Sequence, residues 1–304
     1  DHPDFPWIGM VFAPPIIGIW YWCTDQYIVQ RVLSAKNVSE ARKGTIFAGY
    51  LKLLPIFMFF IPGLIAYAMT KTGQLSYGSS DQVFPTLVRE LLPSGIRGLV
   101  AGGLLAALMS SLSSVFNSCS TLFTMDIYKK LYPETNEKKL VFVGRIATGI
   151  VVLSGILWIP FIKVVSGAGL YTYLQSVQAY IAPPIASVFL LGLFWSRINA
   201  SGALAALVGG FIAGMIRLGL EIKKSTLTVD GIWYQIADLN FLYFAIFSFL
   251  TCVVVLIAVS MLTPHPDLEK INGLTYDTSK KNIAETDHPK SDKINSYIIL
   301  AILA

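Results

Sequence analysis

Polar side chains interrupt four of the apolar stretches in this chain of 304 residues. The first interruption is the segment "IWYWCTDQYIVQR" around Tyr21, and the second is Lys52. The third is a run of serines in "AALMSSLSSVFNS", and the fourth is Gln175. A polar or charged group in hydrocarbon is costly, so such groups usually face a cavity and mark a path or a binding site. These four places are therefore the first candidates for a functional site.

The first interruption combines backbone breakers with polar and aromatic side chains. Pro14 and Pro15 lack backbone donors, and Gly18 adds flexibility. A helix broken here leaves carbonyls unpaired, which is tolerated only where they line a cavity or bind an ion. The alternative is a proline-kinked helix with an aromatic belt at the membrane interface. Four residues that follow the prolines make a poor composition for contact with lipid: Tyr21, Trp22, Thr24 and Asp25.

Lys52 and Gln175 each allow two interpretations. Lys52 lies about nine residues, or roughly 13 Å, into its apolar stretch. Its ammonium group either reaches the membrane surface along its own stem or faces a cavity. Gln175, with Gln178 one turn later, carries an amide that needs a hydrogen-bond partner in lipid. That partner is either a neighbouring helix or a bound solute.

The serine run places small and hydroxylated residues on one helical face. Ala107, Ser110, Ser111 and Ser114 recur at i, i+3, i+4 and i+7. Such a face often serves close helix packing. It could instead coordinate a hard monovalent cation, because hydroxyls and a freed backbone carbonyl supply neutral oxygen ligands.

The composition indicates an all-α, polytopic membrane protein embedded in a lipid bilayer. Hydrophobic residues make up 54% of the chain, charged residues only 13%, and the mean hydropathy is +0.62. Soluble domains carry about 25% charged residues, and runs of about 20 apolar residues, enough to cross a membrane, recur along the chain. The net charge of +5 fits loops that face an anionic leaflet better than a nucleic-acid partner.

The sequence predicts neither an enzyme nor a metal centre of the histidine or cysteine type. The three cysteines are irregularly spaced within apolar runs, and the three histidines lie outside those runs. The chain offers no nucleophile–base pair, phosphate-binding loop or carboxylate pair, and no organic cofactor is expected.

Seven membrane spans and one partial span are predicted, with a short amphipathic helix over 83–92. The full spans are expected at about 7–30, 44–69, 98–127, 140–162, 170–195, 202–220 and 241–262, and the partial span begins at about 296.

Lysine and arginine are concentrated in alternate loops and therefore predict the orientation. The odd-numbered loops are rich in them and should be cytoplasmic, which places residue 1 on the extracellular side of a plasma membrane. The sequons at Asn37 and Asn199 then face the cytoplasm and should not be glycosylated. The small residues Gly202, Ala206, Gly210 and Gly214 predict a seam of close helix packing.

Several long segments in order resemble the sodium/solute symporter family, and within it the sodium/glucose cotransporter branch. They cover about residues 5–262 and include "WYWCTDQYIVQRVLSAKN", "GYLKLLP", "LMSSLSSVFNSCSTLFTMDIY", "YLQSVQAYIAPPIASVFLLGLFW" and "GLFWSRINASGALAALVGG". The resemblance implies a LeuT-type fold of two inverted five-helix repeats with sites near the midplane. The chain would then be a piece of a longer protein. Residues 1–195 would form the second repeat, 196–262 two peripheral helices, 263–295 a cytoplasmic polar segment and 296–304 the start of a last helix.

The same resemblance implies roles for particular residues. The positions matching the sodium site are the Ala107 carbonyl, Ser110 and Ser111, with Ser113 and Ser114 at a possible second sodium site. The positions matching the sugar site are Tyr21 as an aromatic gate, Trp22 beside it, Lys52 and Gln175. Three residues before Tyr21, where relatives often carry a polar sugar-contacting residue, this chain has Gly18.

The implied function is Na+-coupled uptake of a glucose- or galactose-type sugar by alternating access, with Na+ as the coupling ion. Three alternatives remain open. The solute could be myo-inositol or another small molecule. The protein could be a sugar sensor with the same pocket, or an ion channel, although no filter repeated by symmetry is present. The sequence predicts no oligomeric state.

Overall fold

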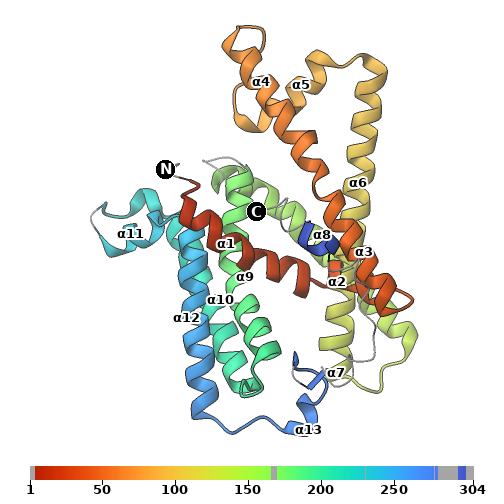
Figure 1. Ribbon diagram of the computed structural model, residues 1–304, viewed down its shortest axis with the longest axis vertical. Helices are drawn as coiled ribbons and strands as arrows, with labels where there is room; N and C mark the ends of the chain where they lie inside the picture. The colour runs from red at the N-terminus through yellow and green to blue at the C-terminus, as the bar shows by residue number, and fades with distance from the viewer. Residues whose placement is uncertain (1–3, 166–169, 230, 277, 280–293, 299–304) are drawn as a thin grey trace. The chain divides into compact units, whose positions relative to one another are not determined.

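The computed structural model describes residues 4–165, 170–229, 231–276, 278–279 and 294–298, and these residues form helices and connecting turns without a strand (Figure 1). Seven helical stretches in this part are long and apolar enough to cross a membrane. They are Trp7–Thr24, Val38–Lys71, Ser94–Leu131, Glu137–Pro160, Leu170–Phe194, Ala200–Ile222 and Phe241–Leu262. The seven expected spans and the all-α, polytopic fold class are confirmed. Most of the expected last span, 296–304, lies outside the described residues, as does residue 1.

The chain divides into two compact units, which we describe separately. Unit 1 comprises residues 1–29 and 172–298, and unit 2 comprises residues 30–171 and 299–304. The helices of unit 1 are α1 (Trp7–Ile19), most of α9 (Leu170–Phe194), α10 (Ala200–Ile222), α11 (Ile232–Asp238), α12 (Phe241–Leu262) and α13 (Leu268–Ile271). The helices of unit 2 are the second half of α2 (Gln26–Leu33), α3 (Val38–Leu51), α4 (Ile61–Lys71), α5 (Val83–Leu91), α6 (Ser94–Thr121), α7 (Lys129–Leu131) and α8 (Glu137–Val165).

The core of unit 1 is formed where α1, α9 and α12 meet. Small residues of α1 and α9 (Ala13, Ala179 and Ala182) let the helices approach, and larger residues fill the space between them. Tyr180 is 1% exposed and belongs to this cluster, as does Leu242 of α12. The packing of α1 against α9 therefore fixes the segment that follows α1.

Glycines of α10 form a seam of close packing against α9 and α12. A Cβ atom added at Gly210 would lie 2.6 Å from Pro184 Cβ and 2.7 Å from Cys252 Sγ. A Cβ atom added at Gly214 would lie 2.7 Å from the Tyr180 carbonyl oxygen. The predicted packing seam is confirmed, because only a hydrogen atom fits between these helices.

The first span is broken where the sequence predicts. After α1, Trp20–Thr24 form one π-helical turn, and Asp25 is extended (φ −71°, ψ 118°) before α2 begins at Gln26. The Thr24 hydroxyl donates to the Trp20 carbonyl at 2.6 Å, and Asp25 Oδ1 accepts from the Tyr27 backbone N–H at 3.1 Å. The break thus satisfies its own backbone groups with local side chains, and Asp25 caps the positive end of α2.

Arg197 and Asn199 fasten the end of α12 to the start of α10. Arg197 Nη2 donates to the Thr263 carbonyl at 2.9 Å. Asn199 Nδ2 donates to the Pro264 carbonyl at 2.8 Å, while Asn199 Oδ1 accepts from the Gly202 N–H at 2.9 Å. Because the last carbonyls of a helix lack partners within the helix, donation from Arg197 Nη2 to the Met261 carbonyl (3.2 Å) and from Asn199 Nδ2 to the Ser260 carbonyl (3.4 Å) satisfies the end of α12, while the Asn199 oxygen caps α10.

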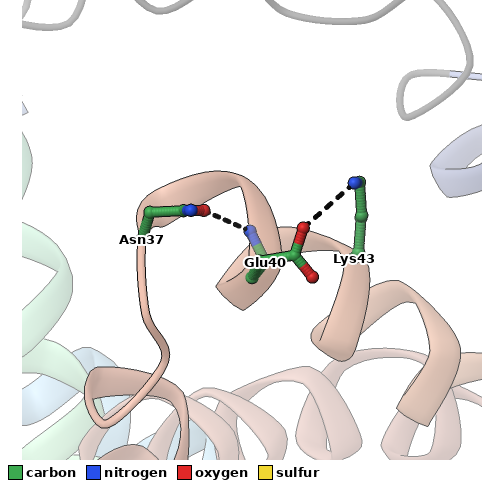
Figure 2. Close-up of polar contacts among 3 residues, drawn as sticks. All are labelled: Asn37, Glu40 and Lys43. Atoms are coloured by element: carbon green, nitrogen blue, oxygen red, sulfur yellow. Dashed lines mark hydrogen bonds and ion pairs between the residues drawn. The ribbon is translucent and has the colours of Figure 1, made fainter.

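Asn37, the asparagine of the other sequon, also caps a helix (Figure 2). Asn37 Oδ1 accepts from the Glu40 N–H at 2.8 Å, and Glu40 Oε1 pairs with Lys43 Nζ at 3.1 Å. These contacts define the start of α3 in unit 2. Asn37 is therefore a helix N-cap. The sequence contains a signal for this role, because an asparagine followed three residues later by a glutamate is typical of a helix start.

The second span is interrupted at Lys52, where the sequence suggested a continuous helix. α3 ends at Leu51, Lys52 and Leu53 form a turn, and a π-helical segment at Ile56–Phe60 leads into α4. Pro55 explains the interruption, because it has no N–H to donate to the Leu51 carbonyl four residues earlier and its ring crowds that carbonyl.

Two long helices of unit 2, α6 and α8, contact each other. At Gly144 of α8 the backbone comes close to α6, and the Ser120 hydroxyl donates to the Gly144 carbonyl at 2.8 Å. This pairing supports the helix that carries the serine run.

The glycine seam generates a stability prediction. Gly210→Ala should lower the melting temperature of the protein in detergent, because Pro184 or Cys252 must move, which costs about 1–3 kcal/mol. Gly209→Ala is the matched control, since a Cβ atom there meets nothing within 4 Å. Alanine is favoured over glycine in helices by about 1 kcal/mol, so this control should not destabilise the protein. Equal melting temperatures for the two variants would contradict the packing.

The cap at the helix break generates a second prediction. Asp25→Ala removes the oxygen that accepts from Tyr27 and should destabilise the start of α2 by about 1 kcal/mol. Hydrogen exchange of the first α2 amides should accelerate about fivefold. Asp25→Asn keeps an accepting oxygen and should exchange at nearly the wild-type rate. Identical exchange in both variants would show that the carboxylate does not cap α2.

Candidate functional site

Three aromatic rings follow one another along the π-helical turn of unit 1. The ring centroids of Tyr21 and Trp22 lie 5.0 Å apart at an interplanar angle of 88°, an edge-to-face contact. Trp20 and Tyr21 lie 6.2 Å apart at 55°. Trp22 is 44% exposed, and Tyr21 is half-buried. The turn therefore presents apolar ring faces beside the backbone of a broken helix, a combination suited to the hydrophobic face of a sugar or cyclic polyol ring.

Gly18 leaves space beside this cluster. A Cβ atom added at Gly18 would meet only Trp22 Cδ1, at 3.9 Å, an ordinary van der Waals distance. A side chain could therefore fit at this position and would lie against Trp22.

Gln175 lies in the first half of α9 and is half-buried. It belongs to unit 1, as do Tyr21 and Trp22. The helices that carry these residues, α1 and α9, share one hydrophobic cluster around Ala13 and Ala179. The packing of unit 1 thus links the two elements that carry its candidate solute residues.

Lys52 belongs to unit 2 and lies at a helix end. Its backbone N–H bonds the carbonyls of Ala48 and Gly49, at 3.0 and 3.1 Å, in the last turn of α3, and its side chain is exposed. A residue at the interruption of a span can project away from the helix stem, so the position is compatible with contact to a bound solute.

The serine run forms one face of α6 in unit 2. Ala107, Ser110 and Ser111 are exposed in this chain, and the helix is regular around them. Ser113 is also exposed, whereas Ser114 is half-buried. Hydroxyl oxygens and carbonyl oxygens are the neutral ligands that such a face can offer to a hard cation. Among the described residues, His, Cys, Asp and Glu form no group of three that could hold a metal ion.

Ser114 connects this face to the end of the broken first span. Its hydroxyl donates to the Ser110 carbonyl at 3.0 Å and accepts from Arg31 Nη2 at 2.9 Å. One turn later, the Ser118 hydroxyl donates to the Ser114 carbonyl at 2.9 Å and accepts from Gln30 Nε2 at 3.3 Å. A chain of hydrogen bonds therefore runs from α2 to the candidate sodium positions.

The contacts of Gln30 and Arg31 were not predicted from the sequence. In the sequence, Arg31 is one of the basic residues of the first loop, whose charges predict the orientation of the chain. The available signal was its position one to two turns after a broken helix, where a polar side chain can turn back toward the bundle. A cation coordinated by the Ser114 hydroxyl would compete with Arg31 for the oxygen lone pairs.

A family model matches the part of the chain in which these positions lie. The model of the sodium:solute symporter family matches residues 2–210, more than half of the chain. All candidate solute and sodium positions lie within this range.

Individual relatives are similar over most of this chain. A sodium/myo-inositol cotransporter 2 of Mus musculus is 39% identical over 93% of this chain and 45% of its own length. A sodium/mannose cotransporter of Bos taurus is 40% identical over 92% of this chain and 50% of its own. A sodium/glucose cotransporter 1 of Ovis aries is 41% identical over 86% of this chain and 42% of its own. The chain spans about half the length of these curated relatives, and it belongs to the sodium:solute symporter family.

Proposed function

We propose that the full-length protein is a Na+-coupled symporter that carries a sugar or polyol across the plasma membrane by alternating access, and that it is not an enzyme. The observation that carries this proposal is the family match over residues 2–210, which contains every candidate site position. The seven apolar helices support it, because they make the chain a multi-pass membrane protein.

The sodium ion is assigned to the face of α6. The Ala107 carbonyl with the hydroxyls of Ser110 and Ser111 forms the main site, and Ser113 and Ser114 contribute to a second site. Neutral oxygens on an exposed helical face support this assignment, because Na+ can then bind without a carboxylate. Inward movement of one Na+ releases about 2.3 kcal/mol per 100 mV of membrane potential, which drives uptake of the solute.

The solute is assigned to Tyr21, Trp22, Lys52 and Gln175. The aromatic rings cover the apolar face of a six-membered ring, while the lysine and glutamine side chains bond its hydroxyls. The relatives are named for myo-inositol, mannose and glucose, which all combine such a ring with several hydroxyls. We expect glucose or galactose as the solute. Myo-inositol is the main alternative, because a polar side chain that could discriminate among the hydroxyls is missing at Gly18.

The architecture we propose for the whole protein is the LeuT-type fold. Residues 1–195 would supply the second inverted repeat, 196–262 two peripheral helices, 263–295 a cytoplasmic segment and 296–304 the start of a further helix. The solute and sodium would then lie between broken helices near the midplane of the bilayer. The break at Asp25 supports this architecture, because interrupted helices expose backbone groups for ligands.

Uptake by the full-length protein in proteoliposomes tests the function. An inward Na+ gradient should drive accumulation of labelled galactose, glucose or myo-inositol, and a K+ gradient of equal size should not. Competition among the three solutes identifies the preferred one. Saturable binding without accumulation would favour a sensor, and solute-independent ion current alone would favour a channel.

Ser111→Ala tests the sodium assignment. Removing one ligand to a cation costs about 1.5 kcal/mol or more, so the Na+ concentration for half-maximal uptake should rise about tenfold. Ser154→Ala is the matched control, because Ser154 is an exposed serine of α8 that bonds its own helix at Ile150. Sodium dependence that is the same in both variants would overturn the assignment of Ser111.

A further inference from the structure

A buried arginine in α10 takes no part in the proposed sodium or solute contacts. Arg217 is 3% exposed although it lies inside a membrane span. Its Nη2 donates to the Leu239 carbonyl at 2.8 Å, just before α12 begins. Its Nε and Nη1 make no hydrogen bond among the described residues. A charge placed this way is expensive, so its surroundings should show what stabilises it.

Two aromatic rings supply that stabilisation. The guanidinium carbon of Arg217 lies 5.7 Å from the ring centroid of Tyr180 in α9 and 5.8 Å from that of Phe244 in α12. The two rings are themselves in edge-to-face contact, with centroids 5.3 Å apart at 90°. Cation–π attraction is strongest where water is absent, so the rings compensate for the two nitrogens without hydrogen bonds.

Besides the contact of its ring with Arg217, Tyr180 makes a hydrogen bond through its hydroxyl. Its hydroxyl donates to Glu221 Oε2, and Glu221 lies one turn after Arg217 on α10. The Tyr180 ring and its hydroxyl are thus both fixed by α10. We call Arg217, Glu221, Tyr180 and Phe244 the arginine clamp.

The arginine clamp includes Tyr180 of α9, the same helix that carries Gln175. Gln175 precedes Tyr180 by five residues, which places it about 140° around the axis of α9. Fixing the Tyr180 side of α9 against α10 therefore fixes the direction in which Gln175 projects. Tyr180 also lies in the same core cluster as Ala13 and Ile17 of α1, the helix that leads into Tyr21.

We propose that Arg217 is a positioning residue for the solute site. By holding Tyr180 between α10 and α12, it sets the rotation of α9 and hence the orientation of Gln175. The inference rests on the proposed function for the role of Gln175, whereas the positioning itself rests only on the contacts within unit 1. Arg217 acts through Tyr180 and does not touch the solute.

Two conservative variants of the full-length protein test the clamp. Arg217→Lys keeps a cation near the rings but loses the planar fork, and Tyr180→Phe keeps the ring but loses the bond to Glu221. A small displacement of a solute-binding residue weakens binding, so the solute concentration for half-maximal uptake should rise about three- to tenfold in each variant. The Na+ concentration for half-maximal uptake should change less than twofold.

A second measurement reports the orientation of α9 without transport. In a Gln175→Cys background, modification by a membrane-impermeant methanethiosulfonate is followed by mass spectrometry of the labelled peptide. Adding Arg217→Lys or Tyr180→Phe should change the labelling rate at position 175 at least threefold, because α9 is free to turn. Tyr243→Phe makes the same chemical change beside Phe244 but outside the clamp, and it should leave both measurements unchanged.

The outcomes separate the clamp from the proposed function. If both variants reach the membrane and show wild-type solute dependence and wild-type labelling, the clamp does not position α9. A fall in maximal rate alone would indicate a merely structural role and would also overturn the proposal. If the unmodified protein shows no Na+-driven uptake, the proposed function fails, while a changed labelling rate would still support the clamp. If Arg217→Lys does not reach the membrane, Tyr180→Phe decides the result.

Discussion

The constraint on which this structure depends is that hydrocarbon offers no hydrogen-bond partner to a polar group. Each polar group at membrane depth must find its partner within the protein. At the break in the first span, the Thr24 hydroxyl and the Asp25 carboxylate satisfy local backbone groups. At the end of α12, Arg197 Nη2 and Asn199 Nδ2 donate to the carbonyls of Met261 and Ser260, which the helix itself leaves open. Side chains of the protein thus supply partners to backbone groups that the break and the helix end leave open.

Close approach between helices follows from the same constraint. In lipid, association gains little from burying apolar surface, so packing and polar contacts must hold helices together. The glycines of α10 bring α9 and α12 close enough for this. Near the other end of α10, Arg217 and Glu221 hold Tyr180 of α9 through its ring and its hydroxyl. Unit 1 thus combines a small-residue seam with a polar and aromatic clamp, and both involve α10.

The serine face of α6 illustrates how one residue type can serve two purposes. Small side chains allow close packing, and their hydroxyls are available as ligands. Ser114 and Ser118 bond the preceding turn of their own helix and accept from Arg31 and Gln30 of α2. Ser110 and Ser111 are exposed in this chain. Hydroxyls of α6 thus differ in surroundings although the sequence presents them as a uniform run.

The sequence by itself determined the seven spans, the break near Asp25 and the glycine seam, because each depends on composition and periodicity within about 20 residues. It also identified the residues on which the sodium and solute predictions rest, and those assignments stay predictions. Only the tertiary structure decided the partners of the long polar side chains. In the sequence, Arg217 is a single charge in an apolar run, and Asn199 is the first residue of a sequon. Their partners are distant along the chain: Arg217 donates to the Leu239 carbonyl, 22 residues away, and Asn199 to the Pro264 carbonyl, 65 residues away. Local patterns carry no information about such contacts, because packing between helices selects them.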